Sequence, residues 1–246
     1  MQLTRNVALL LAAGRGQRME SHVPDKILAP LAGRTVFQWS AEAFLRSRLF
    51  QRVVLVCRDE EQRAELSRLW DACEPDPGTE LALCLGGRER QDSVFLGLVE
   101  AGQDCDYVFI HDCARPLVRP ATLESLYQLV LADKAAALAH PVTDTLQRAE
   151  NQAGRHRDCR VEPVSREGLW AMETPQAFAY PLIFDAYQKA RQEGRAATDD
   201  VSLAAADGHK VSLLPSPDPN PKITTPGDLA LAELLARARV AGVPAS

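Results

Sequence analysis

The sequence of 246 residues lacks a long hydrophobic run. Its longest uninterrupted apolar stretch covers residues 7–13, whereas about 20 apolar residues are needed to span a bilayer. This stretch is followed by Gly14-Arg15-Gly16 instead of a small-residue cleavage site, so it does not have the pattern of a signal peptide. We therefore expect a cytoplasmic protein without a membrane span.

The sequence also lacks an excess of positive charge and any C-x-x-C pair. Its 28 Lys and Arg residues stand against 33 Asp and Glu residues, which gives a formal net charge of −5. General attraction to nucleic acid or to an anionic membrane has no electrostatic basis, so any phosphate binding must be local. The six scattered cysteines indicate reduced thiols, not a zinc site or a disulfide framework.

What the chain does have is the composition and patterning of a folded α/β protein. Hydrophobic residues make up 46% and charged residues 25% of the chain, which excludes disorder. Short apolar runs alternate with segments of helical period, for example around residues 123–130 and 183–190. This alternation predicts a Rossmann-like, mostly parallel sheet flanked by helices. Strands of fully buried length are expected at 7–12, 53–57, 81–85, 107–111, 135–140 and 211–214.

We expect one domain over residues 1–239, followed by a tail at 240–246. The last helix is predicted to begin at Pro226, with Thr225 as its N-cap and Asp228 three residues after the cap. The helical spacing predicts a buried face made of Leu231, Leu234, Leu235 and Ala238.

Two stretches interrupt the alternation. Residues 141–163 are polar and without helical period, and the stretch is too long for a bare connection in a compact domain. We expect a projecting β-arm whose apolar face meets another subunit. In residues 215–221 proline alternates with polar residues, which indicates a stiff, extended loop.

The loop after the first predicted strand contains closely spaced glycines and cations. Residues 12–19 read Ala-Ala-Gly-Arg-Gly-Gln-Arg-Met. Met19 stands where a dinucleotide-binding fingerprint has its third glycine, so the loop does not match that fingerprint. Lys26 is followed by Ile27, which excludes a Walker A loop. A glycine turn near Arg15, Arg18 and Lys26 suits a nucleoside triphosphate; a tight turn with solvated arginines is the purely structural alternative.

A second glycine turn follows the third predicted strand, at residues 86–94 (Gly-Gly-Arg-Glu-Arg-Gln-Asp-Ser-Val). The glycines permit close approach of the backbone to a ligand, and Ser93 could bond the edge of a base. The alternative is a structural turn in which Asp92 or Ser93 caps a helix that begins near Asp92.

An acidic residue, Asp112, follows the fourth predicted strand. At the ligand end of a parallel sheet, its carboxylate is well placed to hold Mg²⁺ against nucleotide phosphates. The alternative is a solvated Asp112 paired with Arg115. We expect His111, at the strand end, to be structural.

Taken together, these motifs resemble those of one enzyme family. Residues 12–26 alone resemble the nucleotidyltransferases that load sugar or polyol phosphates onto nucleotides. Further motifs stand at residues 141–145 (Pro-Val-Thr-Asp-Thr), 166–170 (Arg-Glu-Gly-Leu-Trp), 174–176 (Thr-Pro-Gln), 198–200 (Thr-Asp-Asp) and 220–224 (Asn-Pro-Lys-Ile-Thr). With these, the chain resembles the 2-C-methyl-D-erythritol 4-phosphate cytidylyltransferases of the non-mevalonate isoprenoid route, from about residue 7 to residue 235.

The resemblance implies an activity and an assembly. CMP would be transferred from CTP to 2-C-methyl-D-erythritol 4-phosphate, which gives 4-diphosphocytidyl-2-C-methyl-D-erythritol and pyrophosphate, with Mg²⁺ as the expected metal. The protein would be a homodimer in which the arm crosses to the partner subunit.

The resemblance also implies roles on the CTP side. Arg18 and Lys26 match transition-state stabilisers, and Asp112 matches the acid that binds the metal. The positions that match cytidine-binding residues are Ala12, Ala13, Gly14, Gly86, Gly87 and Ser93.

On the acceptor side, Arg115 matches a residue near the second substrate. The residues that match those holding methylerythritol phosphate are Thr145, Arg166, Thr198 and Lys222. Arg166 and Lys222 would position its phosphate for attack.

The chain departs from the family's pattern at a few positions. Ile27-Leu28 stands where a Gln and an aromatic residue are frequent, Cys113 replaces a usual Ala, and Asp200 replaces a usual Glu. None of these changes removes a charge that the chemistry needs. Cys113 beside Asp112 would make the site sensitive to thiol reagents if the thiol were exposed.

The sequence alone leaves other functions as alternatives. A cytidylyltransferase acting on a longer polyol phosphate, such as ribitol 5-phosphate, would share the CTP half of the site. A nucleotide-sensing module without catalysis could keep the glycine loops, although this chain also carries the acceptor cations. A glycosyltransferase would place D-x-D after a strand, whereas the D-x-D at residues 104–106 precedes one.

Overall fold

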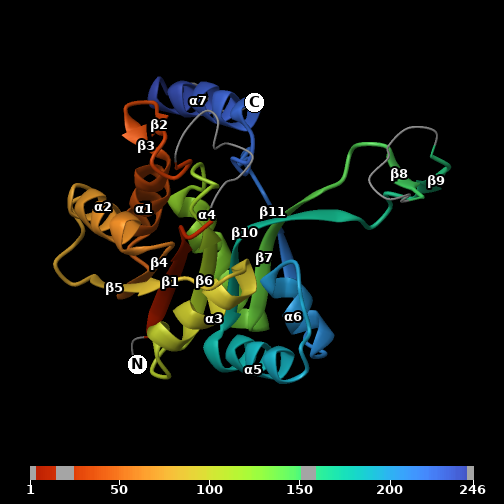
Figure 1. Cartoon of the computed structure of the whole chain (residues 1–246), viewed down its shortest axis with the longest axis horizontal. Helices are drawn as coiled ribbons and strands as arrows, with labels where there is room; N and C mark the ends of the chain where they lie inside the picture. The colour runs from red at the N-terminus through yellow and green to blue at the C-terminus, as the bar shows by residue number, and fades with distance from the viewer. Residues whose placement is uncertain (1–3, 15–24, 151–158, 243–246) are drawn as a thin grey trace.

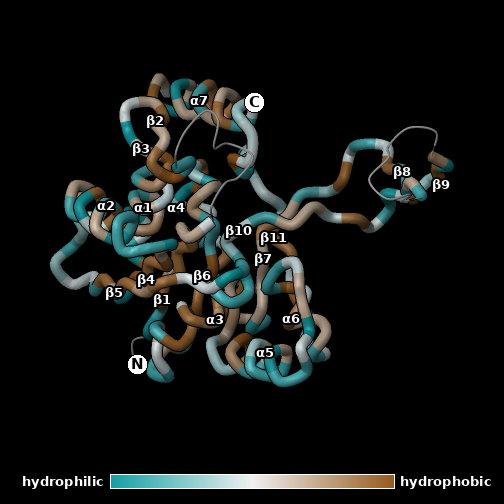
Figure 2. Tube along the Cα trace, in the orientation of Figure 1, coloured by the Kyte–Doolittle hydropathy of each residue, from teal (hydrophilic) through white to brown (hydrophobic). Residues whose placement is uncertain are grey.

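The computed structural model describes residues 4–14, 25–150 and 159–242. A seven-stranded sheet with the order β11-β7-β10-β6-β1-β4-β5 forms its centre (Figure 1). Hydrophobic residues are concentrated along the central strands (Figure 2). The predicted α/β fold with a mostly parallel sheet is confirmed. No helix in the described ranges is long and apolar enough to cross a membrane.

The first half of the sheet is parallel. The fully buried strand β1 (Asn6–Leu11) pairs on one side with β4 (Arg52–Cys57) and on the other with β6 (Tyr107–Asp112). The strand β5 (Glu80–Leu85) lies at the edge and pairs with β4. Because β5 has a strand on one side only, its residues are partly exposed; the expectation of full burial at 81–85 was wrong.

The second half of the sheet contains a strand that the apolar pattern did not predict. The strand β10 (Trp170–Ala179) runs antiparallel between β6 and β7 (Ala135–Pro141). The register of β10 against β7 shifts between Met172 and Gln176. The strand β11 (Ser212–Pro215) pairs parallel to β7 at the other edge and is only partly buried, again because it has one neighbour.

Helices cover both faces of the sheet and form two cores. Alternate residues of β1 point to opposite faces, so Leu10 belongs to one core and Leu9 to the other. The first core is covered by α1 (Val36–Ser47), α2 (Glu60–Asp71), α4 (Pro120–Asp133) and α7 (Pro226–Val240). The second is covered by α3 (Arg90–Ala101), α5 (Tyr180–Gln192) and α6 (Asp200–Ala206). The helical faces predicted around residues 123–130 and 183–190 lie in these cores.

The last helix begins where the sequence predicts, but a different face is buried. The Thr225 hydroxyl accepts a hydrogen bond from the Asp228 amide, and the helix α7 starts at Pro226. However, Leu231 is 47% and Leu234 67% exposed, and Leu235 and Ala238 are only partly buried. The helix instead packs through its small residues Ala232 and Ala236.

The alanine face of α7 is buried because of the short hairpin of β2 (Pro30–Leu31) and β3 (Arg34–Thr35). The helix α7 lies against β2. The Glu233 carboxylate accepts a hydrogen bond of 2.7 Å from the Ala32 amide. This bond fixes the rotation of α7 so that the alanines, which permit close approach, face inward.

The arm predicted at residues 141–163 is present and projects from the body of the molecule (Figure 1). It carries the antiparallel pair β8 (Leu146–Ala149) and β9 (Val161–Val164). Its base is joined by a bond from the Val142 amide to the Leu169 carbonyl (3.0 Å), so the returning strand extends beyond residue 163. Residues 151–158 of the predicted arm lie outside the described residues.

The contact between α3 and β1 depends on the absence of a side chain at Gly97. A Cβ atom at this position would lie 2.2 Å from Leu9 Cδ1 and 3.0 Å from Val56 Cγ2. We expect Gly97→Ala to lower the free energy of unfolding by about 1–3 kcal/mol through overpacking, although Ala favours a helix by about 1 kcal/mol over Gly. Urea denaturation measures this difference.

The matched control is Gly227→Ala in α7, where the nearest atom to an added Cβ is Thr225 Oγ1 at 3.8 Å. This variant should be as stable as the parent or more stable by up to about 1 kcal/mol. A Gly97→Ala protein that matches the parent would contradict the close packing of α3 on β1.

Candidate active site

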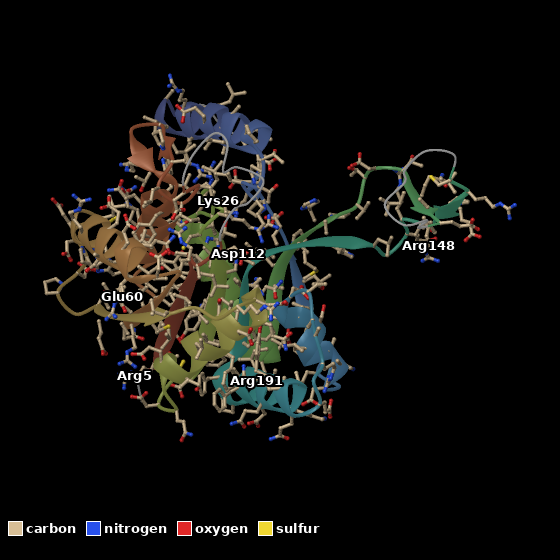
Figure 3. The ribbon with its side chains drawn as sticks, viewed as in Figure 1. Arg5, Lys26, Glu60, Asp112, Arg148 and Arg191 are labelled. Atoms are coloured by element: carbon tan, nitrogen blue, oxygen red, sulfur yellow. The ribbon has the colours of Figure 1, made fainter. Side chains whose placement is uncertain are left out.

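A cavity of about 780 Å³ lies at the carboxyl ends of the central strands. Ligands of open α/β sheets bind at this edge. Its walls come from the loop after β1, the turn before α3, the end of β6 and the segment before α7. The predicted site residues that line it are Ala12, Ala13, Gly14, Lys26, Gly87, Ser93, Asp112 and Lys222. Figure 3 shows Lys26 and Asp112 at this end of the sheet, away from Arg191 on α5.

The two glycine-containing loops pack directly on each other. A Cβ atom at Gly86 would lie 2.7 Å from Ala13 Cβ and 2.7 Å from Ser93 Oγ. The Ser93 hydroxyl accepts a bond from the Gly87 amide and donates to the Glu89 carbonyl, both at 3.1 Å. Gly86 therefore supports the wall of the cavity, and Ser93 fixes the turn.

The helix α3 begins earlier than the sequence suggested. Its N-cap is Glu89, and Asp92 lies at the third helical position, where its carboxylate accepts a bond of 3.2 Å from the Glu89 amide. The alternative in which Asp92 or Ser93 is the N-cap is wrong, because Glu89 has the extended backbone of the residue before the helix.

The position of Lys26 depends on its buried neighbour Asp25. The Asp25 carboxylate accepts bonds from Arg58 (3.0 Å), Gln62 (2.7 Å) and the Ile27 amide (3.0 Å). The Lys26 ammonium donates to the carbonyl of Ile223 at 3.0 Å, so it faces the segment that carries Lys222. Arg15 and Arg18, the other cations of this loop, lie outside the described residues.

Asp112 is the buried negative charge of the cavity. Its Oδ1 accepts a bond from Arg90 Nε (3.0 Å), and its Oδ2 accepts one from Lys222 Nζ (2.5 Å). Burial alone would raise the pKa of this carboxyl group, but the charges of Arg90 and Lys222 outweigh it and hold the pKa well below its ordinary value. Asp112 is therefore a carboxylate at neutral pH.

The alternative pairing of Asp112 with Arg115 is wrong. The Arg115 guanidinium donates instead to the carbonyls of Asn220 (3.0 Å) and Met172 (3.2 Å). Burial lowers the pKa of Arg115. This arginine joins β10 to the segment before α7, and it does not line the cavity.

His111 is structural, as the sequence suggested. The Asp112 amide donates to Thr174 Oγ1, and the Thr174 hydroxyl donates to His111 Nδ1. His111 Nε2 in turn donates to the Arg115 carbonyl, and each of the three bonds is 3.1 Å long. Burial lowers the pKa of His111 to about 3, so the ring is neutral and can both accept and donate. The chain of bonds orients the backbone at Asp112.

Three residues of this cluster were not assigned from the sequence. Arg90 donates to both oxygens of Asp200 at 3.0 and 2.9 Å, and the Tyr187 hydroxyl donates to Asp200 at 2.5 Å. Burial alone would lower the pKa of Arg90, but the charges of Asp200 and Asp112 raise it. Two of them could be noticed in the sequence, since Arg90 belongs to the motif at residues 86–94 and Asp200 departs from the family's usual Glu.

The acceptor residues inferred from the resemblance are not brought together within this chain. Thr145 and Arg166 lie exposed on the arm, where Arg166 donates to the carbonyl of Thr143. Thr198 is exposed in the connection before α6. Of this set, Lys222 lines the cavity, and it does so while paired with Asp112.

A divalent metal would have one carboxylate ligand here. Among the described residues, no group of three or more His, Cys, Asp and Glu side chains could hold a metal ion. Mg²⁺ in nucleotide sites is held by one or two carboxylates together with substrate phosphates and water. Asp112, charged and at the wall of the cavity, fits a metal that also binds the phosphates.

Cys113 follows Asp112 but should be unreactive. It is fully buried, and burial raises the pKa of its thiol well above the ordinary value. Because the thiolate is the reactive form, we expect Ellman's reagent at pH 8 to leave Cys113 unmodified in the native protein and to reach the half-buried Cys159 first. Mass spectrometry of the labelled protein identifies the sites.

Denaturation in guanidinium serves as the control, since all six cysteines should then react. Burial also raises the pKa of Cys57 and Cys105 to about 12, so these two should remain unlabelled beside Cys113. Rapid labelling of Cys113 in the native state would show that the cavity floor opens.

Comparisons with known proteins identify the family. The model of the 2-C-methyl-D-erythritol 4-phosphate cytidylyltransferase family matches residues 6–238. The family member of Pelotomaculum thermopropionicum is 39% identical over 232 residues, which cover 94% of each chain. That of Deinococcus radiodurans is 39% identical over 233 residues, covering 94% of this chain and 89% of the relative.

Solved structures show the same likeness. The 2-C-methyl-D-erythritol 4-phosphate cytidylyltransferase of Thermus thermophilus is 30% identical, with a TM-score of 0.73 over 94% of this chain and 99% of that one. The 4-diphosphocytidyl-2C-methyl-D-erythritol synthase of Anaerococcus prevotii has a TM-score of 0.80 at 22% identity, over 95% and 99% of the two chains, and this likeness supports the fold. The chain therefore belongs to the 2-C-methyl-D-erythritol 4-phosphate cytidylyltransferase family.

Proposed function

We propose that this protein transfers CMP from CTP to 2-C-methyl-D-erythritol 4-phosphate. The products are 4-diphosphocytidyl-2-C-methyl-D-erythritol and pyrophosphate. Family membership supports the activity. The observation that carries the chemistry is the convergence of Lys26, Asp112 and Lys222 on one cavity beside the two glycine loops.

The reaction needs charge neutralisation more than proton transfer. A phosphate oxygen of the acceptor attacks the α-phosphorus of CTP in line, and the bond from the α-phosphorus to the bridging oxygen of pyrophosphate breaks. The attacking phosphate is already an anion, so we assign no general base. The obstacle is to bring two anions together and to stabilise the charge that develops at the α-phosphate.

On the nucleotide side, the backbone of residues 12–14 and 86–87, together with Ser93, would bind the cytidine. Lys26 and Arg18 would bind the triphosphate and stabilise the transition state. Asp112 would hold Mg²⁺, which, when bound, supplies positive charge to the nucleotide phosphates.

On the acceptor side, Lys222 and Arg166 would position the attacking phosphate. The hydroxyls of Thr145 and Thr198 would complete the binding of methylerythritol phosphate, and Arg115 would lie near it. A cytidylyltransferase for ribitol 5-phosphate would share the nucleotide side, but the family matches do not favour it, and they do not favour a nucleotide-sensing module without catalysis.

We expect pyrophosphate release with CTP, Mg²⁺ and methylerythritol phosphate, and little or none with ribitol 5-phosphate. ATP, GTP and UTP should replace CTP poorly, because the glycine loops present a fixed backbone to one base. A coupled assay of pyrophosphate measures all combinations. Release with ribitol 5-phosphate in place of methylerythritol phosphate would contradict the assigned acceptor.

In the same assay, Lys26→Ala should lose turnover by about 100- to 1000-fold, the range for removing one fixed donor to developing charge. A variant with Lys210→Ala is the matched control, since Lys210 follows α6 and does not line the cavity. Turnover of Lys26→Ala within a few-fold of the parent would remove Lys26 from the proposed mechanism.

We also propose that the protein is a homodimer whose arm reaches the site of the partner subunit. Two observations support this. The arm carries exposed apolar side chains, with Val161 54% exposed. Thr145 and Arg166, which the mechanism needs near the acceptor, lie on the arm and away from the cavity of their own chain.

Light scattering should therefore give about twice the 27.0 kDa mass of one chain. Val161→Asp should shift the protein toward the monomer mass, because it places a charge in the apolar contact. The matched control is Val99→Asp on α3, where the valine is equally exposed at 54%. A parent protein with the mass of one chain would contradict the dimer, and a dimeric Val161→Asp protein would exclude this part of the arm from the contact.

A further inference from the structure

We propose that Arg90 is a positioning residue that keeps the Asp112 carboxylate compensated and in place when Lys222 leaves it, for the acceptor phosphate or to make room for a cation. This inference rests on the proposed roles of Asp112 and Lys222. The starting point is the free protein, in which Lys222 is paired with Asp112 and so is not available to an acceptor.

The two cations on Asp112 bind different oxygens. Arg90 Nε bonds Oδ1 at 3.0 Å and Lys222 Nζ bonds Oδ2 at 2.5 Å. Departure of Lys222 would therefore free one oxygen and leave the other bonded. The geometry permits an exchange at Oδ2 without loss of the contact at Oδ1.

Arg90 is firmly held, and this distinguishes it from Lys222. Its two terminal nitrogens bond Asp200 at 3.0 and 2.9 Å, and Asp200 is fully buried. Asp200 in turn accepts the Tyr187 hydroxyl, and its amide donates to Gln176 at 3.1 Å. Arg90 also begins the helix α3.

Lys222 comes instead from a segment without helix or strand, between β11 and α7. Its side chain is 37% exposed, compared with 28% for Arg90. Of the two cations, Lys222 is the one that can move with little change elsewhere.

The charges of the cluster support the same division of roles. Asp112 and Asp200 carry two negative charges, and Arg90 and Lys222 carry two positive charges. Removing the last partner from a buried carboxylate is strongly unfavourable. Because Arg90 remains, Asp112 keeps a partner when Lys222 departs, and its free oxygen faces the cavity as a ligand for a cation.

The bonds of Arg90 depend on the shape of its guanidinium group. Its planar guanidinium donates two parallel bonds to Asp200 and a third, from Nε, to Asp112. A lysine would keep the charge but would lose this fixed fork. Arg90→Lys therefore separates position from charge.

The experiment compares CTP binding with and without Mn²⁺, in the absence of an acceptor, for the parent, Arg90→Lys, Asp112→Asn and the double variant. Isothermal calorimetry gives the affinities. We expect Arg90→Lys to reduce the gain in affinity from Mn²⁺ by about 10- to 100-fold, the range for residues that orient a metal ligand. If Arg90 acts through Asp112, the double variant should be no worse than Asp112→Asn.

The matched control is Arg191→Lys. Arg191 pairs at 3.3 Å with Asp92, which like Arg90 lies in α3, but Arg191 does not line the cavity. The increase in CTP affinity with Mn²⁺ should therefore stay within about twofold of the parent in this variant. Thermal unfolding reports whether Arg90→Lys is folded. If it is not, Tyr187→Phe removes one bond to Asp200 and should reduce the gain by about two- to tenfold.

Two outcomes overturn the inference. One is an increase in CTP affinity with Mn²⁺ that is as large in folded Arg90→Lys as in the parent. If Arg90→Lys does not fold, the same result in Tyr187→Phe has this meaning. The other is a double variant whose losses add, because Arg90 would then act independently of Asp112. Failure of the parent to release pyrophosphate with methylerythritol phosphate overturns the proposed function instead, and the binding comparison without acceptor separates the two cases.

Discussion

The negative charge buried at the end of β6 must be compensated, and this requirement joins four parts of the chain. Asp112 ends β6, Arg90 begins α3, Asp200 begins α6, and Lys222 lies in the segment before α7. Arg90 and Asp200 are 110 residues apart in the sequence, and so are Asp112 and Lys222. The cavity floor therefore forms only when both halves of the sheet and their helices have assembled, and the fold and the site depend on the same ion pairs.

The sequence predicted the parallel half of the fold because buried parallel strands are short apolar runs. The sequence did not predict β10, because its buried polar residues Glu173, Thr174 and Gln176 interrupt any apolar run. Thr174 and Gln176 are buried without loss because they bond side chains that are distant in the sequence. The sequence also failed to predict the buried face of α7, because helical spacing finds an apolar stripe but not the surface against which the helix lies. The bond between Glu233 and Ala32 decided that rotation.

The site could be predicted where it consists of contiguous motifs and not where it consists of distant pairs. The glycine loops, Lys26, Asp112 and Lys222 were named from the sequence, and the structure places them in one cavity. Arg90 and Asp200 meet across 110 residues, and such an ion pair leaves no periodic pattern. The alternative pairing of Arg115 with Asp112 followed from closeness in sequence, whereas backbone carbonyls on two other elements are its partners.

The arm is a continuation of two neighbouring core strands, β7 and β10, whose pairing runs from Ala135 and Phe178 in the core to Pro141 and Trp170 at its base. Residues 135–139 are buried, whereas most of the described residues of the arm are exposed. The free energy of local opening should therefore fall along the arm from the body toward the tip. Substitutions in the arm carry little penalty for folding, so this segment can evolve new contact preferences while the cavity and its ion pairs stay unchanged.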